Sequence, residues 1–307
     1  MKKTFFILTT AALFAFSCTK PEEDTGPRLI FKFKFDSTQI RLNNFGNASV
    51  IPAGNAAQSP KFNLMGAHYI ELAPDSTTIL TTGEILYKAS EVTTGGSTAI
   101  DFSKEVVKGE GQEFFSVPLK NITPGFYKWL RVSLAYQNFD VNMIYRTNSY
   151  NSGNPISLNG TVAAFIGFDT YITSYKVKDQ TVTVNANKKQ GYGAVEITNL
   201  PLGAPAQVPF TWQSPSGATT VPNPISITSP IPPGSCVVTG RFPAGLTITG
   251  NETNDIVITV SISTNKSFEW KDKNSDGLFE PVDGLNSNAV LDSVVDMGVR
   301  GLIPYVN

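Results

Sequence analysis

Apolar and polar residues alternate in several stretches of the chain, which is the pattern of β-strands with one buried face. Phenylalanine alternates with lysine in residues 29–35, and this spacing places three aromatic rings on one face: Phe31, Phe33 and Phe35. The same alternation recurs in residues 181–186 and, most clearly, in residues 255–263. We therefore expect a strand at each of these places, with its apolar face toward a core.

Helical periodicity is scarce by comparison. Residues 102–107 have some helical character and residues 289–295 could form one or two turns, but neither segment is long enough to carry a fold. The 25 glycines and 20 prolines recur at short intervals between the strand-like runs. Frequent turns between short strands are typical of sandwiches and barrels, so the prediction is an all-β fold with one or two β-sandwich units in tandem.

A polar, turn-rich segment at residues 148–155 lacks an apolar face and is the best place for a domain boundary. On this interpretation residues 28–150 form a β-sandwich domain and residues 151–307 form a second β-rich domain. One large sandwich built from both halves is the alternative. The proline-rich stretch 201–243 is not expected to form a central strand, because proline cannot donate a hydrogen bond to a neighbouring strand.

The amino terminus has the layout of a secretory signal. Two lysines precede an apolar segment, residues 5–16, that is too short to span a bilayer comfortably. The segment ends Ala15-Phe16-Ser17-Cys18, which resembles the bacterial lipobox, in which the cysteine is lipidated and becomes the first mature residue. The resemblance implies a signal peptide at residues 1–17, lipidation of Cys18 and a polar tether at residues 18–27. A plain signal peptide with an incidental cysteine is the alternative.

A lipobox implies an outer-membrane lipoprotein of the Gram-negative cell envelope, with its body facing the periplasm or the cell surface and the membrane as a partner through the lipid. Removal of residues 1–17 takes away two lysines and leaves 22 basic and 25 acidic residues, a net charge of −3. There is no basic stripe, so no nucleic-acid partner is expected. Cys236 is then the only unmodified thiol, and an internal disulfide is excluded.

Residues 272–283 carry the one motif with recognisable chemistry. The spacing Asp-x-Asn-x-Asp-Gly, with a further acid at position twelve, resembles the calcium loop of EF-hand and dockerin-like modules. Oxygen atoms at alternate positions of such a loop converge on a hard cation, while Gly277 permits the sharp turn. The expected calcium ligands are Asp272, Asn274, Asp276, the backbone carbonyl of Leu278, Glu280 and Asp283.

Helices are not expected on either side of this loop, because a strand-like run precedes Asp272 and Pro281 disfavours an exit helix. We therefore predict a structural Ca²⁺ that pins a short C-terminal segment against the body, with Phe279 packed into the core. An acidic hairpin turn that binds no metal is the alternative interpretation of the same residues.

The sequence shows no catalytic constellation. His68 is the single histidine and no Gly-x-Ser-x-Gly elbow accompanies it, so we expect it at a strand start, hydrogen-bonded or half exposed. Cys236 is expected to be a small buried residue rather than a nucleophile. Four glutamates are candidates for glycoside hydrolysis by residue type alone: Glu71, Glu84, Glu196 and Glu269.

Three segments of the N-terminal half are similar to the methanobactin-binding-protein-like family of periplasmic lipoproteins: residues 30–33, 62–72 and 117–127. The resemblance implies a β-sandwich with a Gly-x-Tyr hairpin turn. The metal-associated role of that family is not carried over, because the histidines that such a site would use are missing.

These observations predict a lipid-anchored cell-envelope protein that acts as a non-enzymatic binding or structural module, with a glycan or an envelope protein as its partner. Trp212 is the candidate residue for stacking on a sugar ring. The alternative is a carbohydrate-active enzyme whose paired carboxylates are not identifiable from sequence. No catalytic residue is assigned, and Ca²⁺ is the only bound ion expected.

Overall fold

The computed structural model describes residues 25–43, 45–76, 78–146, 154–199, 209–214, 236–283, 291–297 and 301–307. Within these ranges the chain forms β-strands and two single turns of 3₁₀ helix, Phe102–Lys104 and Leu119–Asn121. The expectation of an all-β, β-sandwich-type fold is confirmed. None of the described residues belongs to a helix long and apolar enough to cross a membrane.

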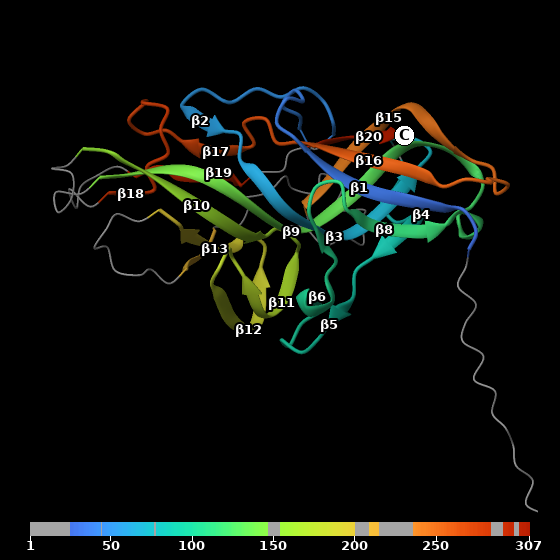
Figure 1. Cartoon of the computed structure of the whole chain (residues 1–307), viewed down its shortest axis with the longest axis horizontal. Coiled ribbons are helices and arrows are strands. Elements are labelled where there is room, and N and C mark those ends of the chain that lie inside the picture. Colours follow the sequence, from blue (N-terminus) through green and yellow to red (C-terminus); the bar gives the residue numbers. More distant parts are fainter. Residues whose placement is uncertain are drawn as a thin grey trace, which may run out of the picture.

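A nine-stranded sheet is the centre of the molecule (Figure 1). Its main path runs in the order β14 (Phe210–Gln213), β13 (Tyr192–Ile197), β10 (Ile156–Phe165), β9 (Gly125–Arg146), β3 (Lys61–Ala73) and β4 (Glu84–Lys88). Three further strands join it at the side of β9 or β3: β15 (Cys236–Ile248), β18 (Val282–Asp283) and β7 (Val107–Lys108). The 22-residue β9 pairs with β3, β10, β15 and β18.

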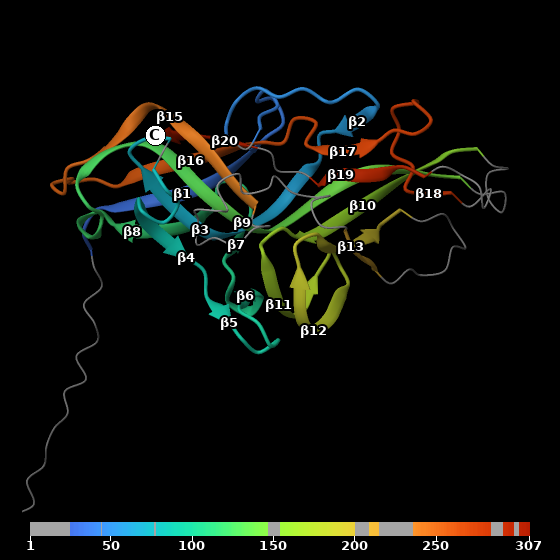
Figure 2. The ribbon, with the colours of Figure 1, turned by 180° about the vertical axis from the view of Figure 1, so that it is seen from behind.

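Three smaller sheets surround this centre. The first contains β20 (Leu302–Val306), β16 (Ile256–Ser263), β1 (Arg28–Asp36) and β8 (Glu113–Pro118). The second contains β12 (Thr181–Lys189), β11 (Asp169–Lys176), β6 (Ala99–Asp101) and β5 (Glu91–Val92). The third contains β19 (Ser293–Met297), β17 (Phe268–Lys271) and β2 (Asn55–Gln58). Figures 1 and 2 show the β1–β16–β20 sheet and the β11–β12 sheet on opposite sides of the central sheet.

The main core lies between the central sheet and the β1–β16 sheet. Its buried side chains include Phe31 and Phe33 from β1, Leu130 and Val132 from β9, and Val260 from β16. Each such side chain stabilises the fold by roughly 1.5–3 kcal/mol through removal of apolar surface from water. A second cluster, on the other face of the central sheet, joins β9, β10 and β13 to β11 through Tyr136, Phe165, Tyr175 and Tyr192.

The strands predicted from alternation are confirmed as β1, β12 and β16. The helical expectation for residues 289–295 is wrong, because β19 begins at Ser293 and pairs with β17. Residues 102–107 form only one 3₁₀ turn before β7. Most of the proline-rich stretch 201–243 lies outside the described residues. Of its described parts, β14 is the last strand of its sheet, and β15 pairs with β9 with Pro243 inside a register shift, where no proline N–H is needed.

Strands on both sides of the predicted boundary at residue 150 share sheets and core. All ten residues of β10 pair with β9, and β1 runs parallel to β16 from Leu29–Ile256 to Asp36–Ser263. The main core likewise draws side chains from both halves. This pairing favours one continuous unit, the alternative to two tandem domains.

Glu105 is a buried carboxyl without a partner. It lies between the first 3₁₀ turn and β7, and it packs against Gly66, where an added Cβ would come within 2.9 Å of Oε1. Both carboxyl oxygens are shielded from solvent and accept no hydrogen bond. Burial raises the pKa of Glu105 to about 8, so the neutral form is favoured in the folded protein.

We predict that the Glu105→Gln variant is more stable than the native chain above about pH 8 and equally stable near about pH 4. The folded state keeps a proton that the unfolded chain releases at an ordinary pKa of 4.5. The free energy of unfolding of the native chain is therefore highest below that value and falls as the pH rises toward about 8. The fall is about 1.4 kcal/mol per pH unit between the two pKa values, about 4–5 kcal/mol in all. Urea unfolding midpoints across this pH range measure the difference.

The matched control is Glu113→Gln, which changes an exposed carboxyl on β8 and is expected to leave the pH profile unaltered. A native chain that gained stability relative to Glu105→Gln as the pH rose would contradict the raised pKa of Glu105.

Candidate functional site

The predicted calcium loop follows β17 and leads into β18. Its backbone turns through two left-handed residues, Ser275 with a φ of 61° and Gly277 with a φ of 77°. Asp272 Oδ2 accepts the N–H of Gly277 at 2.8 Å, and Asp276 Oδ1 accepts the N–H of Leu278 at 2.8 Å. The loop is thus folded around side chains that the sequence predicts as ligands.

Three of these side chains meet at one point. Asn274 Nδ2 donates to Asp276 Oδ2 at 3.0 Å and to Glu280 Oε2 at 2.8 Å. Asp272 Oδ1 is shielded from solvent and has no hydrogen-bond partner. A cation at the place of the Asn274 amide nitrogen would meet both carboxylates directly, and a half-turn of that amide would present Oδ1 as a further oxygen ligand.

The other two predicted ligands, Leu278 and Asp283, do not take part in this cluster of side chains. The carbonyl of Leu278 accepts a hydrogen bond from Trp270 Nε1 at 3.1 Å, which leaves one lone pair for a cation. Asp283 pairs through its backbone with Arg146 of β9, and its side chain lies outside the described residues. Phe279 is buried against Phe268 and Trp270, so its predicted packing is confirmed.

Asp292 is a member of this region that sequence spacing misses. Its Oδ1 accepts the N–H of Lys273 at 3.1 Å and its Oδ2 accepts the N–H of Glu280 at 2.8 Å, so one carboxylate ties both ends of the loop. Burial and the nearby charges of Asp272 and Glu280 raise the pKa of Asp292, against the two N–H groups that lower it. The charges of Asp272 and Glu280 are therefore near enough to Asp292 to disfavour its ionised form.

The donor set contains only oxygen atoms, which are the ligands that calcium takes. No three His, Cys, Asp or Glu side chains among the described residues converge closely enough to hold a metal by themselves. Asparagine and backbone oxygens must complete the shell, as they do in calcium loops generally. The residues present fit Ca²⁺ on this condition, and the calcium site stays a prediction.

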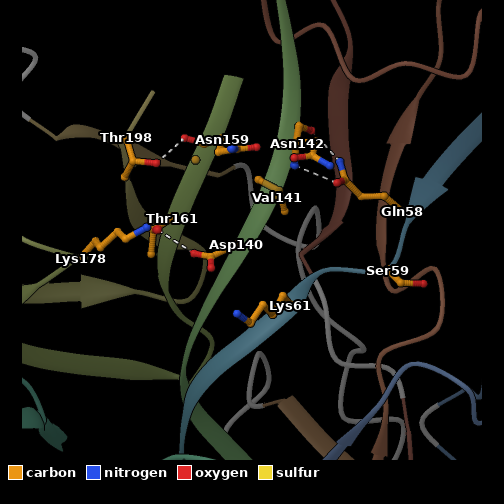
Figure 3. A pocket seen from close by; sticks show the side chains of 11 residues that line it. Gln58, Ser59, Lys61, Asp140, Val141, Asn142, Asn159, Thr161, Lys178 and Thr198 are labelled. Carbon is orange, nitrogen blue, oxygen red and sulfur yellow. Dashed lines mark hydrogen bonds between the residues drawn. The ribbon is translucent and has the colours of Figure 1, made fainter. Parts of the chain in front are cut away.

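A second feature is a polar depression on the open part of the central sheet, with a volume of about 300 Å³ (Figure 3). We call it the polar depression and define it by the residues that line it: Gln58, Ser59, Lys61, Asp140, Val141, Asn142, Asn159, Gly160, Thr161, Lys178 and Thr198.

Strand register brings its floor together. Asp140 of β9 lies opposite Thr161 of β10 on one side and opposite Lys61 of β3 on the other. Asn142 lies opposite Asn159 in the next row. Because residues two apart point to the same face of a sheet, these five polar side chains form two adjacent rows.

One wall of the depression is the β11–β12 turn, which is held by a single carboxylate. Glu196 Oε2 accepts the backbone N–H groups of Lys178, Asp179 and Gln180 at 3.0, 3.0 and 3.1 Å. Burial opposes the charge of Glu196, but these N–H groups and the Lys178 ammonium outweigh it and lower the pKa. Asn138 Nδ2 also donates to the carbonyl of Val177 at 2.7 Å, so the turn is fixed to β9 as well.

The opposite wall is the β2–β3 connection. Gln58 Oε1 accepts the N–H of Asn142 at 2.9 Å, and Gln58 Nε2 donates to the carbonyl of Asn142 at 2.8 Å. The pairing of β3 with β9 begins at Lys61, opposite Asp140. Asn142 lies beyond that point, and the Gln58 side-chain amide takes the place of a backbone partner for it. Both walls are therefore held in place by hydrogen bonds.

The charges of the depression are unequal. Lys61 and Lys178 lie on either side of the Asp140–Thr161 pair (Figure 3). Asp140 Oδ1 accepts Thr161 Oγ1–H at 2.6 Å and Asn63 Nδ2–H at 3.2 Å. Among the described residues neither lysine ammonium lies within salt-bridge distance of a carboxylate. The lining itself presents two cations and one anion, while the Glu196 carboxylate of the wall, bonded to three backbone N–H groups, offsets part of the Lys178 charge.

Three of the four glutamates considered for glycoside hydrolysis have structural partners. Glu71 Oε1 accepts the N–H of Gly83 at 2.7 Å, and Oε2 lies 3.7 Å from Arg131 Nη1, with both side chains buried. Glu269 pairs with Arg41 and accepts a hydrogen bond from Asn55. Glu196 holds the β11–β12 turn, while Glu84 is a partly exposed residue at the start of β4.

His68 and Cys236 are both buried. His68 lies inside β3, so the expectation of a strand start is wrong. Of the two expected environments, hydrogen-bonded or half exposed, the first is confirmed, because the buried Nε2 lies 3.0 Å from Glu91 Oε1. Burial lowers the pKa of His68, although Glu91 opposes this. Burial raises the pKa of the Cys236 thiol to about 12, so it is not a thiolate at neutral pH, in agreement with its predicted role.

Trp212 lies on β14 opposite Gly193, where an added Cβ would come within 2.7 Å of the indole ring. The ring is half-buried and packs against the main core, and its role in stacking stays a prediction. Cys18, the signal peptide and most of the tether lie outside the described residues.

Comparison of the chain with protein-family models, with curated proteins and with solved structures gave no match. The resemblances to lipobox lipoproteins, calcium loops and the methanobactin-binding-protein-like family therefore stay predictions.

Proposed function

We propose that the chain is a lipid-anchored cell-envelope protein that works as a non-enzymatic binding module, with Ca²⁺ as a structural ion in the loop that begins at Asp272. The lipobox at Cys18 supports the anchor. The surroundings of Glu71, Glu196 and Glu269 support a non-enzymatic role, because each carboxylate already serves a structural contact. The polar depression supplies a surface that a ligand can reach.

The calcium part of the proposal is carried by the meeting of Asp276 and Glu280 at one amide beside the unpartnered oxygen of Asp272. Like charges at short range destabilise the loop unless a cation or proton compensates them. Ca²⁺ would neutralise the repulsion that Asp272 and Glu280 exert on Asp292. Since Asp292 binds the backbone at both ends of the loop, the ion would also secure the segment that leads to β19.

The anchor is tested by the Cys18→Ala variant in a Gram-negative host. We expect the native chain in the membrane fraction with an acylated amino terminus, and the variant released from that fraction and without acyl mass. Cell fractionation followed by intact-mass spectrometry measures both. A native chain that was soluble and unacylated would rule out the lipobox and leave a plain signal peptide.

The calcium site is tested by thermal melting of residues 19–307 in EDTA and in about 10 mM calcium. With a dissociation constant on the order of 0.1–1 mM, as in weak extracellular sites, calcium is expected to stabilise the chain by about 1.5–3 kcal/mol. Asp272→Ala is expected to abolish this increase, because it removes the unpartnered oxygen. Asp179→Ala, in the exposed β11–β12 turn, is the matched control and keeps it. Equal melting of the native chain in both buffers would sink the calcium proposal.

A further inference from the structure

We propose that the polar depression binds an acidic saccharide, with the carboxylate of a uronic-acid residue between Lys61 and Lys178 and the ring hydroxyls on the amide and hydroxyl side chains of β9 and β10. This inference rests on the proposed binding function and names its ligand class. It uses residues that are separate from the calcium loop.

The lining has the chemistry of a sugar site. Its side chains offer amide donors and acceptors on Gln58, Asn142 and Asn159, hydroxyls on Thr161 and Thr198, and a carboxylate acceptor on Asp140. A pyranose ring carries several neighbouring hydroxyl groups, each of which both donates and accepts. An apolar ligand would bury these polar groups without partners, which costs binding free energy for each unsatisfied group.

The two lysines select for negative charge. Lys178 comes from the β11–β12 wall and Lys61 from the floor, and the two side chains lie on either side of the Asp140–Thr161 pair (Figure 3). Asp140 already accepts hydrogen bonds from Thr161 and Asn63, so its charge is partly satisfied. An incoming carboxylate therefore meets two ammonium groups that form no salt bridge with a described side chain, although the Glu196 carboxylate attracts Lys178 from farther away. Hydrogen bonds between charged groups are the stronger kind.

The site is built before the ligand arrives. The Glu196 carboxylate fixes the backbone of Lys178 through the turn, and the Gln58 amide fixes the opposite wall to Asn142. The β-sheet register fixes the floor. Such preorganisation reduces the ordering entropy that binding must overcome. The volume of about 300 Å³ lies at the small end of ligand sites, which fits one or two sugar residues of a chain that extends into solvent.

The test is isothermal titration of the mature chain with trigalacturonic acid, its methyl ester and inorganic phosphate, in EDTA so that calcium cannot bridge ligand and protein. We expect saturable binding of the acid, binding at least about tenfold weaker for the neutral ester, and no comparable binding of phosphate. The double variant Lys61→Gln/Lys178→Gln is expected to lose at least about tenfold in affinity for the acid and nothing for the ester.

The matched control is Lys176→Gln, an exposed lysine on β11 outside the depression, which is expected to bind like the native chain. Glu196→Ala tests the wall: it is expected to weaken acid binding and to speed hydrogen exchange at the Lys178–Gln180 amides. Circular dichroism and melting establish that each variant is folded.

The outcomes separate the two proposals. Equal affinity for acid and ester would overturn the choice of an acidic ligand. Phosphate binding as tight as that of the acid would reduce the depression to an anion site. Absence of all binding, in a chain that calcium stabilises, would overturn the saccharide site and leave the structural calcium ion in place. Binding of the acid by a chain that calcium does not stabilise would support the saccharide site in the depression and contradict the calcium site in the loop.

Discussion

The architecture depends on one strand that is too long to have a single environment. β9 extends over 22 residues and has four strand partners, so its two faces must satisfy different neighbours along its length. One face supplies Leu130, Val132 and Leu134 to the main core. The other face carries Tyr136 beneath the β11–β12 sheet and then, at every second residue, the polar side chains Asn138, Asp140 and Asn142.

On the face of β9 beneath the β11–β12 sheet, the change from apolar to polar side chains coincides with the edge of that sheet. Asn138 donates to the carbonyl of Val177, where β11 has ended, and beyond this contact the central sheet is open to solvent. A polar row is what an open sheet face requires, because water or a ligand must satisfy it. The polar depression is thus a direct consequence of a covering sheet that is shorter than the strand beneath it.

Buried charges join segments that are distant in sequence. Arg41 pairs with Glu269 across 228 positions, and Arg131 lies beside Glu71 between two central strands. Such ion pairs add little net stability to the fold. A substitution that removes one partner, however, leaves the other charge buried and uncompensated, which costs about 3–5 kcal/mol. Their value is therefore in specifying which segments meet, since any other arrangement would bury a single charge.

The sequence predicts local features of this fold well because alternation is a local signal. Phe31 and Phe33 identify β1, and Phe279 is buried as its loop position implies. The depression was not predictable, because Lys61, Asp140 and Thr161 come together only through the register of three strands. Asp292 is not predictable for a related reason: it reaches the loop from the position just before β19, outside the twelve-residue spacing. Residues 289–295 were assigned helical character because short apolar runs fit both periods.

The most direct test of the account is terbium luminescence of the mature chain. Tb³⁺ is a hard cation that takes the oxygen ligands of Ca²⁺, and the Trp270 indole is bonded at 3.1 Å to the carbonyl of Leu278 in the loop. The account predicts sensitised emission on excitation of tryptophan, displaced by excess calcium and lost in both Asp272→Ala and Trp270→Phe. Absence of emission from the native chain, or emission that persists in Asp272→Ala, would contradict a cation site in this loop.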